Sequence, residues 1–177
     1  MLGAVAERRE GEHTWAGLGI HHVTLIVNDR QRAEQFYGEV LGLEPKPRPK
    51  FRFPGLFYYC GKQEVHLIIT SRPLANAELF FEFDGIPDFT RRFVHRHAAF
   101  VVDDTSEIEQ KLKDHGIEVL FSANSPAIQL EGSFENVAVQ GWIRMYGSVP
   151  VFCLDPFGNL LEFVPGTNLE ISRPDGP

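Results

Sequence analysis

An internal repeat is the feature that most limits the folds open to this sequence. The segment HHVTLIVND at 21–29 is matched by HAAFVVDD at 97–104, with His22 aligned on His97 and the apolar positions in step. Apolar residues at alternate positions are typical of a half-buried β-strand. The sequence therefore predicts a duplicated unit, in which each copy begins with a strand that carries a histidine near its start.

A helix is predicted after each of these strands. In the first copy, apolar residues recur at helical spacing until Gly42, a residue type that commonly ends helices. This apolar face consists of Ala33, Phe36, Tyr37, Val40 and Leu41. In the second copy, Ser106 and Glu109 have the spacing of a capping box, and Gly116 marks the end of the helix. The order strand then helix therefore occurs twice.

Each helix is followed by strand patterns that predict a hairpin. In the first copy GLFYYC and EVHLIIT flank a short glycine-containing loop, and in the second WIRMYGSVPVFCLD and LLEFV flank PFGN. Each half then has the order strand, helix and about three strands, which leaves one sheet face uncovered, so two halves are expected to close over one another. The predicted organisation is a loose N-terminal extension at 1–19, a first module at 20–70, a connector at 71–95, a second module at 96–166 with an insertion at 122–139, and a tail at 167–177.

Charge and hydropathy indicate a small-molecule partner. The chain carries 17 basic and 24 acidic side chains, a formal net charge of −7 at pH 7, which disfavours a nucleic-acid or anionic-membrane surface. No apolar run is long enough for a membrane span, and the opening MLGAVAERREGEHTW lacks the continuous apolar stretch of a signal peptide. The prediction is a globular cytoplasmic protein that binds a small molecule, without nucleic acid or membrane as partner.

Strand periodicity places four potential metal ligands at equivalent positions of the two halves. In the repeated strands, His22 and His97 point away from the residues that pack on the helices, and in the closing strands His66 and Glu162 lie on the corresponding face. A pseudo-twofold arrangement would bring all four into one cavity. Three neutral imidazoles and a carboxylate suit a divalent transition metal such as Fe, Ni, Co, Mn or Zn. A single strand histidine is more often structural, so the matched positions carry this prediction.

Two further segments allow alternative interpretations. In KPRPKFR at 46–52, prolines alternate with basic residues, which predicts either an exposed edge strand or a basic lip for an anionic substrate, the edge being favoured. Trp142, Arg144 and Tyr146 alternate as on one face of a strand. If that face is concave, Arg144 and Tyr146 would bind a substrate carboxylate or oxyanion, and a surface ladder is the equal alternative. His21, on the helix-facing side, is predicted to be structural or solvated.

Four motifs carry a family resemblance: GIHHVTLIVND…FYGEVLGLE, VHLIIT, RHAAFVVDD and LDPFGNLLEF. They resemble motifs of the vicinal oxygen chelate superfamily, which includes glyoxalase I, fosfomycin-resistance proteins, methylmalonyl-CoA epimerase and extradiol dioxygenases. The resemblance implies an α+β fold in which two paired βαβββ modules form a curved, incompletely closed mixed β-barrel with flanking helices. It also implies that the metal positions are His22, His66, His97 and Glu162, and that the protein is a homodimer, as many members are. A complete site could then form within one chain, or between modules of two chains as in some relatives.

The resemblance further implies a divalent-metal-dependent enzyme that chelates vicinal oxygens of a small substrate and stabilises an enolate or oxyanion. Glu162 would then be catalytic, exchanging between metal ligation and proton transfer. Glyoxalase I proteins typically carry a carboxylate or related oxygen ligand where this chain has His66. Isomerase or lyase chemistry is favoured, ahead of extradiol ring cleavage and of group transfer that opens a strained ring. A metal-free small-molecule binding protein of the bleomycin-resistance kind is the alternative to an enzyme.

Overall fold

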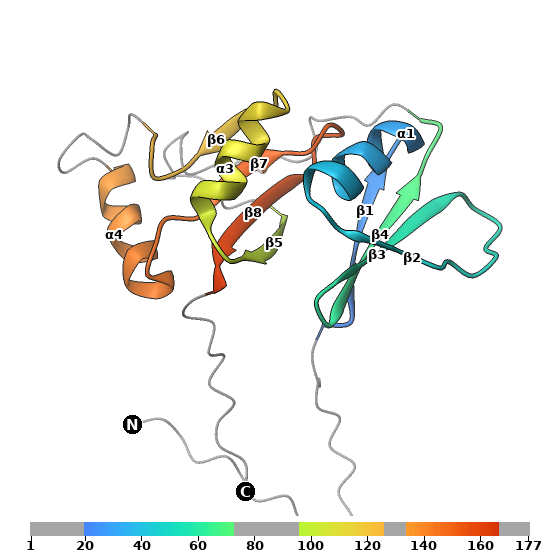
Figure 1. Cartoon of the computed structure of the whole chain (residues 1–177), viewed down its shortest axis with the longest axis horizontal. Helices are drawn as coiled ribbons and strands as arrows, with labels where there is room; N and C mark the ends of the chain where they lie inside the picture. Colours follow the sequence, from blue (N-terminus) through green and yellow to red (C-terminus); the bar gives the residue numbers. More distant parts are fainter. Residues whose placement is uncertain (1–19, 73–95, 126–133, 167–177) are drawn as a thin grey trace, which may run out of the picture.

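Two four-stranded sheets dominate the computed structural model, which describes residues 20–72, 96–125 and 134–166 (Figure 1). The first sheet has the strand order β1-β4-β3-β2 and the second β5-β8-β7-β6, so the halves share one topology. In each sheet the first two strands of this order are parallel and the other pairs antiparallel. The strands are β1 (His22–Val27), β2 (Glu44–Lys46), β3 (Gly55–Cys60), β4 (Gln63–Ile69), β5 (His97–Val102), β6 (Val119–Phe121), β7 (Val151–Leu154) and β8 (Leu160–Pro165).

The predicted hairpins are both present, whereas the edge strand predicted at 46–52 is mostly wrong: β2 ends at Lys46 and residues 47–54 form a loop. β3 pairs with β4 around Gly61, which has a positive φ of 61° that favours glycine. β7 pairs with β8 in the second half. β2 lies at the outer edge of the first sheet and pairs only with β3, as expected of a segment whose prolines lack an amide hydrogen.

The helix after β1 has the predicted buried face. Asp29 caps α1 (Arg30–Ala33) with its side chain, and the chain continues as the π-helical segment η1 (Glu34–Val40), which ends before Gly42 at φ 71°. The wider π-helical turn still directs the apolar residues toward the sheet. The buried residues are Ala33, Phe36, Tyr37 and Val40, and Leu41 is partly buried beside them.

Helix α3 (Thr105–Asp114) begins in a different way from the prediction. Its N-cap is Asp104, whose carboxylate accepts a hydrogen bond from the Ser106 amide at 2.7 Å, so the predicted capping box of Ser106 and Glu109 is wrong. Asp104 occupies the repeat position of Asp29, the cap of α1. The same duplicated aspartate therefore starts the helix in both halves.

The main correction concerns the segment predicted as a strand through Trp142, Arg144 and Tyr146. These residues belong to helix α4 (Phe134–Tyr146). Side chains two positions apart point to different sides of a helix, so the predicted one-face stripe does not exist. Trp142 packs on two buried phenylalanines of the second sheet, with ring centroids 5.3 and 5.8 Å away, and this tertiary contact favours the helix over a strand.

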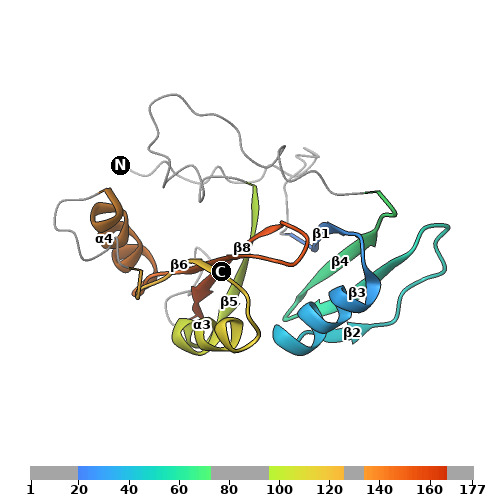
Figure 2. The ribbon, with the colours of Figure 1, turned by 90° about the horizontal axis from the view of Figure 1, so that it is seen from above.

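One hydrophobic cluster joins the two halves, whose helices α1 and α3 lie on the same side of the sheets (Figure 2). The turn after β7 strengthens this contact. Asp155 accepts a hydrogen bond from the Tyr37 hydroxyl at 2.5 Å, and the Asn159 side-chain amide donates to the Ile26 carbonyl at 3.0 Å. The expected α+β fold of two paired modules with incompletely closed sheets is therefore confirmed.

The predicted terminal extension and tail, most of the connector and part of the insertion lie outside the described residues. In the part of the chain that the structure describes, no helix combines the length and apolar character that crossing a bilayer requires.

Candidate functional site

Two of the predicted ligands, His22 and His66, lie together on the open face of the first sheet. In the parallel pair β1 and β4, His22 is opposite Glu64 and Thr24 is opposite His66, so both histidines project away from the helices. Their rings are stacked, with centroids 4.1 Å apart and an interplanar angle of 18°. Phe57 of β3 stacks on the other side of His66 at 3.6 Å and 4°. The imidazole of His66 is therefore held between two rings.

Glu64 is the residue of this face that the sequence analysis missed. Its carboxylate accepts a hydrogen bond from Nε2 of His66 at 2.9 Å and also binds Lys46 of the edge strand. The hydrogen bonds from His66 and then from Lys46 lower the pKa of Glu64 to about 2. Strand alternation places Glu64, two residues before His66, on the same face. The signal for this residue was therefore present in the sequence.

His21 lies on the same cluster and not on the helix-facing side, where it was predicted. Its Nδ1 is 3.0 Å from Nδ1 of His22, and its Nε2 is 3.6 Å from the carboxylate of Glu64. His21 precedes β1 and is exposed, so strand alternation does not fix its direction. Partial desolvation, followed by the His66 and His21 rings, lowers the pKa of His22. This shift favours the neutral imidazole, the form that binds metals.

The other two predicted ligands, His97 and Glu162, form the equivalent pair on the second sheet. Nε2 of His97 is 2.9 Å from Oε2 of Glu162, and Glu162 is only 6% exposed. Adjacent ligand atoms around an octahedral ion with bonds of about 2.1 Å are separated by about 3 Å. The spacing of these two donor atoms, and the burial of the carboxylate with an imidazole partner, therefore fit a pair of metal ligands.

The structure gathers the four residues into two pairs and not into one cluster. Across residues 20–72, 96–125 and 134–166, no three His, Cys, Asp or Glu side chains are placed to hold one ion. Catalytic metal centres usually have at least three protein ligands. A single chain thus presents two half-sites with two donors each, and the convergence of all four stays a prediction.

Helix α4 packs on the sheet face that carries Glu162. Trp142 packs on Phe152, the cross-strand neighbour of Glu162, and Tyr146 follows one helical turn after Trp142. Burial, and then the Glu162 carboxylate, raises the pKa of Tyr146, so its hydroxyl lies near this pair. Arg144, between these two positions, is exposed. The substrate-binding roles of Arg144 and Tyr146 stay predictions, and Tyr146 is the one placed beside a candidate ligand.

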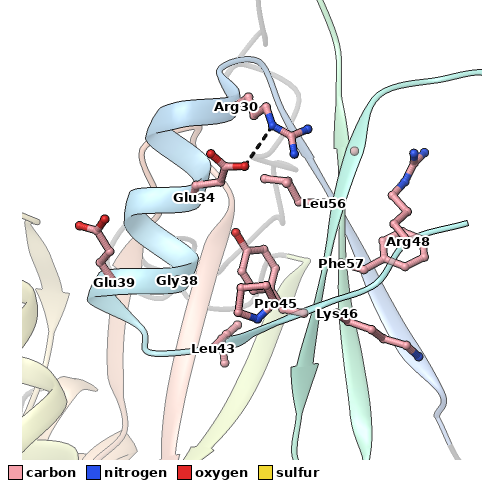
Figure 3. Close-up of a pocket in the computed structure, with 12 residues that line it drawn as sticks. Arg30, Glu34, Gly38, Glu39, Leu43, Pro45, Lys46, Arg48, Leu56 and Phe57 are labelled. Carbon is pink, nitrogen blue, oxygen red and sulfur yellow. Dashed lines mark ion pairs between the residues drawn. The ribbon is translucent and has the colours of Figure 1, made fainter. Parts of the chain in front are cut away.

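A separate cavity of about 580 Å³ lies at the outer edge of the first sheet, between α1 and η1 on one side and β2 and β3 on the other (Figure 3). Leu43 and Leu56 give it apolar walls. Charged walls come from Arg48 and from the ion pair of Arg30 with Glu34, whose atoms are 3.0 Å apart. The residues that line this cavity do not include the four predicted ligands.

Comparison with known proteins identifies the family. The model of the Glyoxalase/Bleomycin resistance protein/Dioxygenase superfamily matches residues 19–163. The chain belongs to this superfamily. No match was found among curated proteins.

Solved structures support the assignment to this superfamily. A glyoxalase family protein from Bacillus anthracis is 25% identical, with 87% of this chain and 98% of that chain covered and a TM-score of 0.54. A lactoylglutathione lyase from Agrobacterium tumefaciens is 23% identical, with 85% and 95% covered and a TM-score of 0.50. The fosfomycin resistance protein FosX from Listeria monocytogenes is 16% identical, with 88% and 97% covered and a TM-score of 0.51. The last two show that the superfamily fold is shared.

Proposed function

We propose that this protein is a divalent-metal-dependent enzyme of the glyoxalase and dioxygenase type, acting on a small molecule with two neighbouring oxygens, with isomerase or lyase chemistry favoured. The observation that carries the proposal is the occurrence of two donor pairs, His22–His66 and His97–Glu162, at equivalent positions of a duplicated fold. Three imidazoles and one carboxylate suit a divalent transition metal. When bound, such an ion would supply Lewis acidity that stabilises negative charge on the substrate oxygens.

The complete site is proposed to form between two copies of the chain. The described residues of one copy bring no three donors together, while the shared core and the Tyr37–Asp155 hydrogen bond hold its two halves side by side. In a twofold homodimer, the His22–His66 pair of one copy would meet the His97–Glu162 pair of the other. Symmetry would then generate two identical sites.

The protein's own groups would perform the remaining steps. Glu162 would exchange between metal ligation and proton transfer, its buried carboxylate taking the substrate proton when it leaves the ion. Helix α4 would exclude water from this face through Trp142, which strengthens electrostatic interactions there. Tyr146 has a raised pKa and would stay protonated, so its hydroxyl would act as a hydrogen-bond donor to the substrate.

A metal-free small-molecule binding protein is the second candidate. One observation favours it: each half-site of the described chain supplies two donors and not three. The His97–Glu162 ion pair would then serve to satisfy a buried carboxylate.

Metal analysis separates the two candidates. Wild type, His66→Ala and Glu162→Ala are purified without chelator, incubated with Ni²⁺ and desalted. We expect about one ion per chain in wild type and loss of most of it in both variants after desalting, since each lacks one of the four proposed ligands and should bind the ion more weakly. His115→Ala is the matched control, because His115 caps the end of α3 and belongs to neither pair. Equal and negligible metal in all four proteins would favour the binding protein.

Mixing two defective variants tests the two-chain site. In a heterodimer of His66→Ala with Glu162→Ala, one site carries both substitutions and the other carries neither. A refolded equimolar mixture should therefore recover about a quarter of the wild-type metal content if the pairs meet across a dimer. Sites built within one chain would give no recovery, because every chain keeps its own substitution.

Two assays then separate the reaction classes. Turnover of a glutathione hemithioacetal by the metal-loaded protein would support isomerase or lyase chemistry. Oxygen uptake with catechols would support the extradiol dioxygenase alternative. The same assays on Glu162→Ala show whether either activity depends on the proposed site.

A further inference from the structure

Arg48 carries a charge that the proposed metal site does not use. It lies in the loop that joins β2 to β3. Lys46, two residues earlier, is paired with Glu64, whereas within the described residues Arg48 makes no ion pair with a carboxylate. The chain has an excess of acidic residues, and a partly buried arginine usually finds one of them. The charge of Arg48 is therefore available to a ligand.

Aromatic rings and one carbonyl fix the guanidinium group in place. Its Cζ lies 4.8, 4.9 and 5.5 Å from the ring centroids of Phe51, Phe53 and Phe57, which is within cation–π range. Nη2 donates a hydrogen bond to the Phe53 carbonyl at 2.6 Å. Nε is buried without an acceptor in the described structure and lies over Gly55, where a Cβ would be 3.3 Å from it. The group is thus positioned without being neutralised.

Two of the phenylalanines beside Arg48 expose apolar surface to solvent. Phe51 is 47% exposed and Phe53 is 44% exposed, and their rings are stacked at 5.2 Å and 12°. Exposed apolar groups that gather in one place commonly mark a binding surface. We call Arg48, Phe51, Phe53 and Phe57 the Arg48 patch. It combines exposed aromatic rings with a fixed positive charge, and so complements a molecule that has an aromatic or apolar body and a terminal oxyanion.

Phe57 connects the Arg48 patch with the candidate metal ligands. Its ring stacks on His66 at 3.6 Å, and the guanidinium carbon of Arg48 is 5.5 Å from the same ring. Phe57 and His66 are cross-strand partners, so both lie on the open face of the first sheet. Only the Phe57 ring therefore separates Arg48 from His66, so a small molecule held at His22 and His66 could also contact Arg48. Arg48 also lines the cavity of about 580 Å³ in Figure 3, a volume typical of small-ligand sites.

We propose that Arg48 binds the oxyanion of the substrate, a carboxylate or a phosphate whose planar apolar body lies on Phe51 and Phe53. The planar guanidinium fork matches the geometry of either anion. As a statement about the enzyme's substrate, this inference rests on the proposed function. As a statement about Arg48, it is tested on protein without metal.

Three probes of similar size test the Arg48 patch on the full chain stripped of metal: phenylacetate, phenyl phosphate and the neutral phenylacetamide. NMR titration, followed through the backbone N–H signals of the protein, gives the Kd of each probe. We expect one or both anions to bind at least about tenfold more tightly than the amide, because only they can accept the guanidinium hydrogen bonds with a full charge. The tighter of the two anions identifies the oxyanion. Equal affinities for all three probes would overturn the proposal.

Two substitutions in the same loop locate the charge that matters. Arg48→Met keeps a long side chain between the phenylalanines and removes the charge, so we expect it to lose the preference for anions. Arg52→Gln removes an exposed charge of the loop and should change the Kd values by less than about twofold. An unchanged preference for anions in Arg48→Met would show that the assignment is wrong. If this variant fails to fold, the comparison of the anions with the amide on wild type still decides.

Metal analysis keeps this inference distinguishable from the proposed function. An Arg48-dependent preference for anions in a protein that binds no metal would support the Arg48 patch and contradict the enzyme. Bound metal without any preference for anions would contradict the Arg48 patch alone.

Discussion

On the first sheet, His66 lies between two rings on an open face, whereas on the second sheet its counterpart Glu162 is buried beneath α4. Cross-strand pairing shows how closely the two positions correspond: Phe57 is opposite His66, and Phe152 is opposite Glu162. Phe57 is partly exposed and stacks flat on the imidazole, while Phe152 is 2% exposed and packs under Trp142.

This difference shows that two factors determine a site separately: the strand order, and the elements that pack over the sheet. The duplicated strand order fixes where donor side chains project, and it does so equally in both halves. The environment of each donor depends on what lies over the sheet. In the first half His22 is exposed and His66 is half-buried beside the charged side chains of Lys46 and Glu64, whereas in the second half Glu162 is buried beside an exposed His97.

The largest effect is expected from truncating the matched phenylalanines. Phe152→Ala should lower the free energy of unfolding by about 4 kcal/mol, because it leaves a cavity among buried side chains. Phe57→Ala should cost only about 1 kcal/mol, the loss of ring stacking at a partly exposed position. Urea unfolding of both variants measures the difference. Equal losses would show that the two faces are covered to a similar extent.

A smaller loss, about 3 kcal/mol, is expected when the hairpin turn of the second half is disrupted. Asp155→Ala removes the acceptor of the Tyr37 hydroxyl and of two backbone amides, which leaves buried donors unsatisfied. The matched control is Lys62→Ala in the short exposed turn of the first half, where we expect a change below about 0.5 kcal/mol. Thermal and urea unfolding measure both. A small loss for Asp155→Ala would mean that the contact between the halves depends on the apolar cluster alone.

Most of the fold could be predicted from the sequence because the repeat and the strand periodicity are local signals. They correctly placed β1, β4, β5 and β8, together with the buried face of the first helix. The segment at Trp142 was mistaken for a strand, because a short aromatic and apolar run has no decisive period and its helix depends on packing against the second sheet.

The candidate site could be predicted only in part. Alternation selects the face of His66 correctly, and applied once more it would have found Glu64 on that face. The pairing of His22 with His66, and of His97 with Glu162, follows from strand neighbours. Whether the two pairs meet depends on how whole modules pack, which no local pattern encodes.

An intermediate effect, about 2 kcal/mol, is expected from removing the cover of the second sheet. Trp142→Ala deletes a partly buried indole that contacts the sheet, whereas Ile143→Ala shortens a neighbouring side chain that is 41% exposed and should cost below about 0.5 kcal/mol. Urea unfolding of the two variants gives the comparison. Similar small losses would show that α4 does not protect the face that carries Glu162.

The smallest effect is expected in the pH dependence of stability in metal-free protein. The contributions of Glu64 and Asp155 to the free energy of unfolding should change with pH in opposite directions. The hydrogen bond from His66 and the contacts with Lys46 lower the pKa of Glu64 from 4.5 to about 2. Its stabilising contribution is therefore complete above about pH 4.5 and is lost as the pH falls toward 2. Burial raises the pKa of Asp155 above 3.8, so its contribution is complete below about pH 3.8 and is lost as the pH rises through the raised value.

Urea unfolding between pH 2.5 and 7, with EDTA present, measures this contrast against two isosteric variants. The stability of wild type relative to Glu64→Gln should increase with pH over the acid range, because only the ionised carboxylate gains from its cationic neighbours. The stability of wild type relative to Asp155→Asn should decrease with pH, because ionisation places a charge in a buried turn. Slopes of the same sign would mean that both carboxylates lie in similar electrostatic environments. The contrast between Glu64, stabilised by cationic neighbours, and the buried Asp155 would then be wrong.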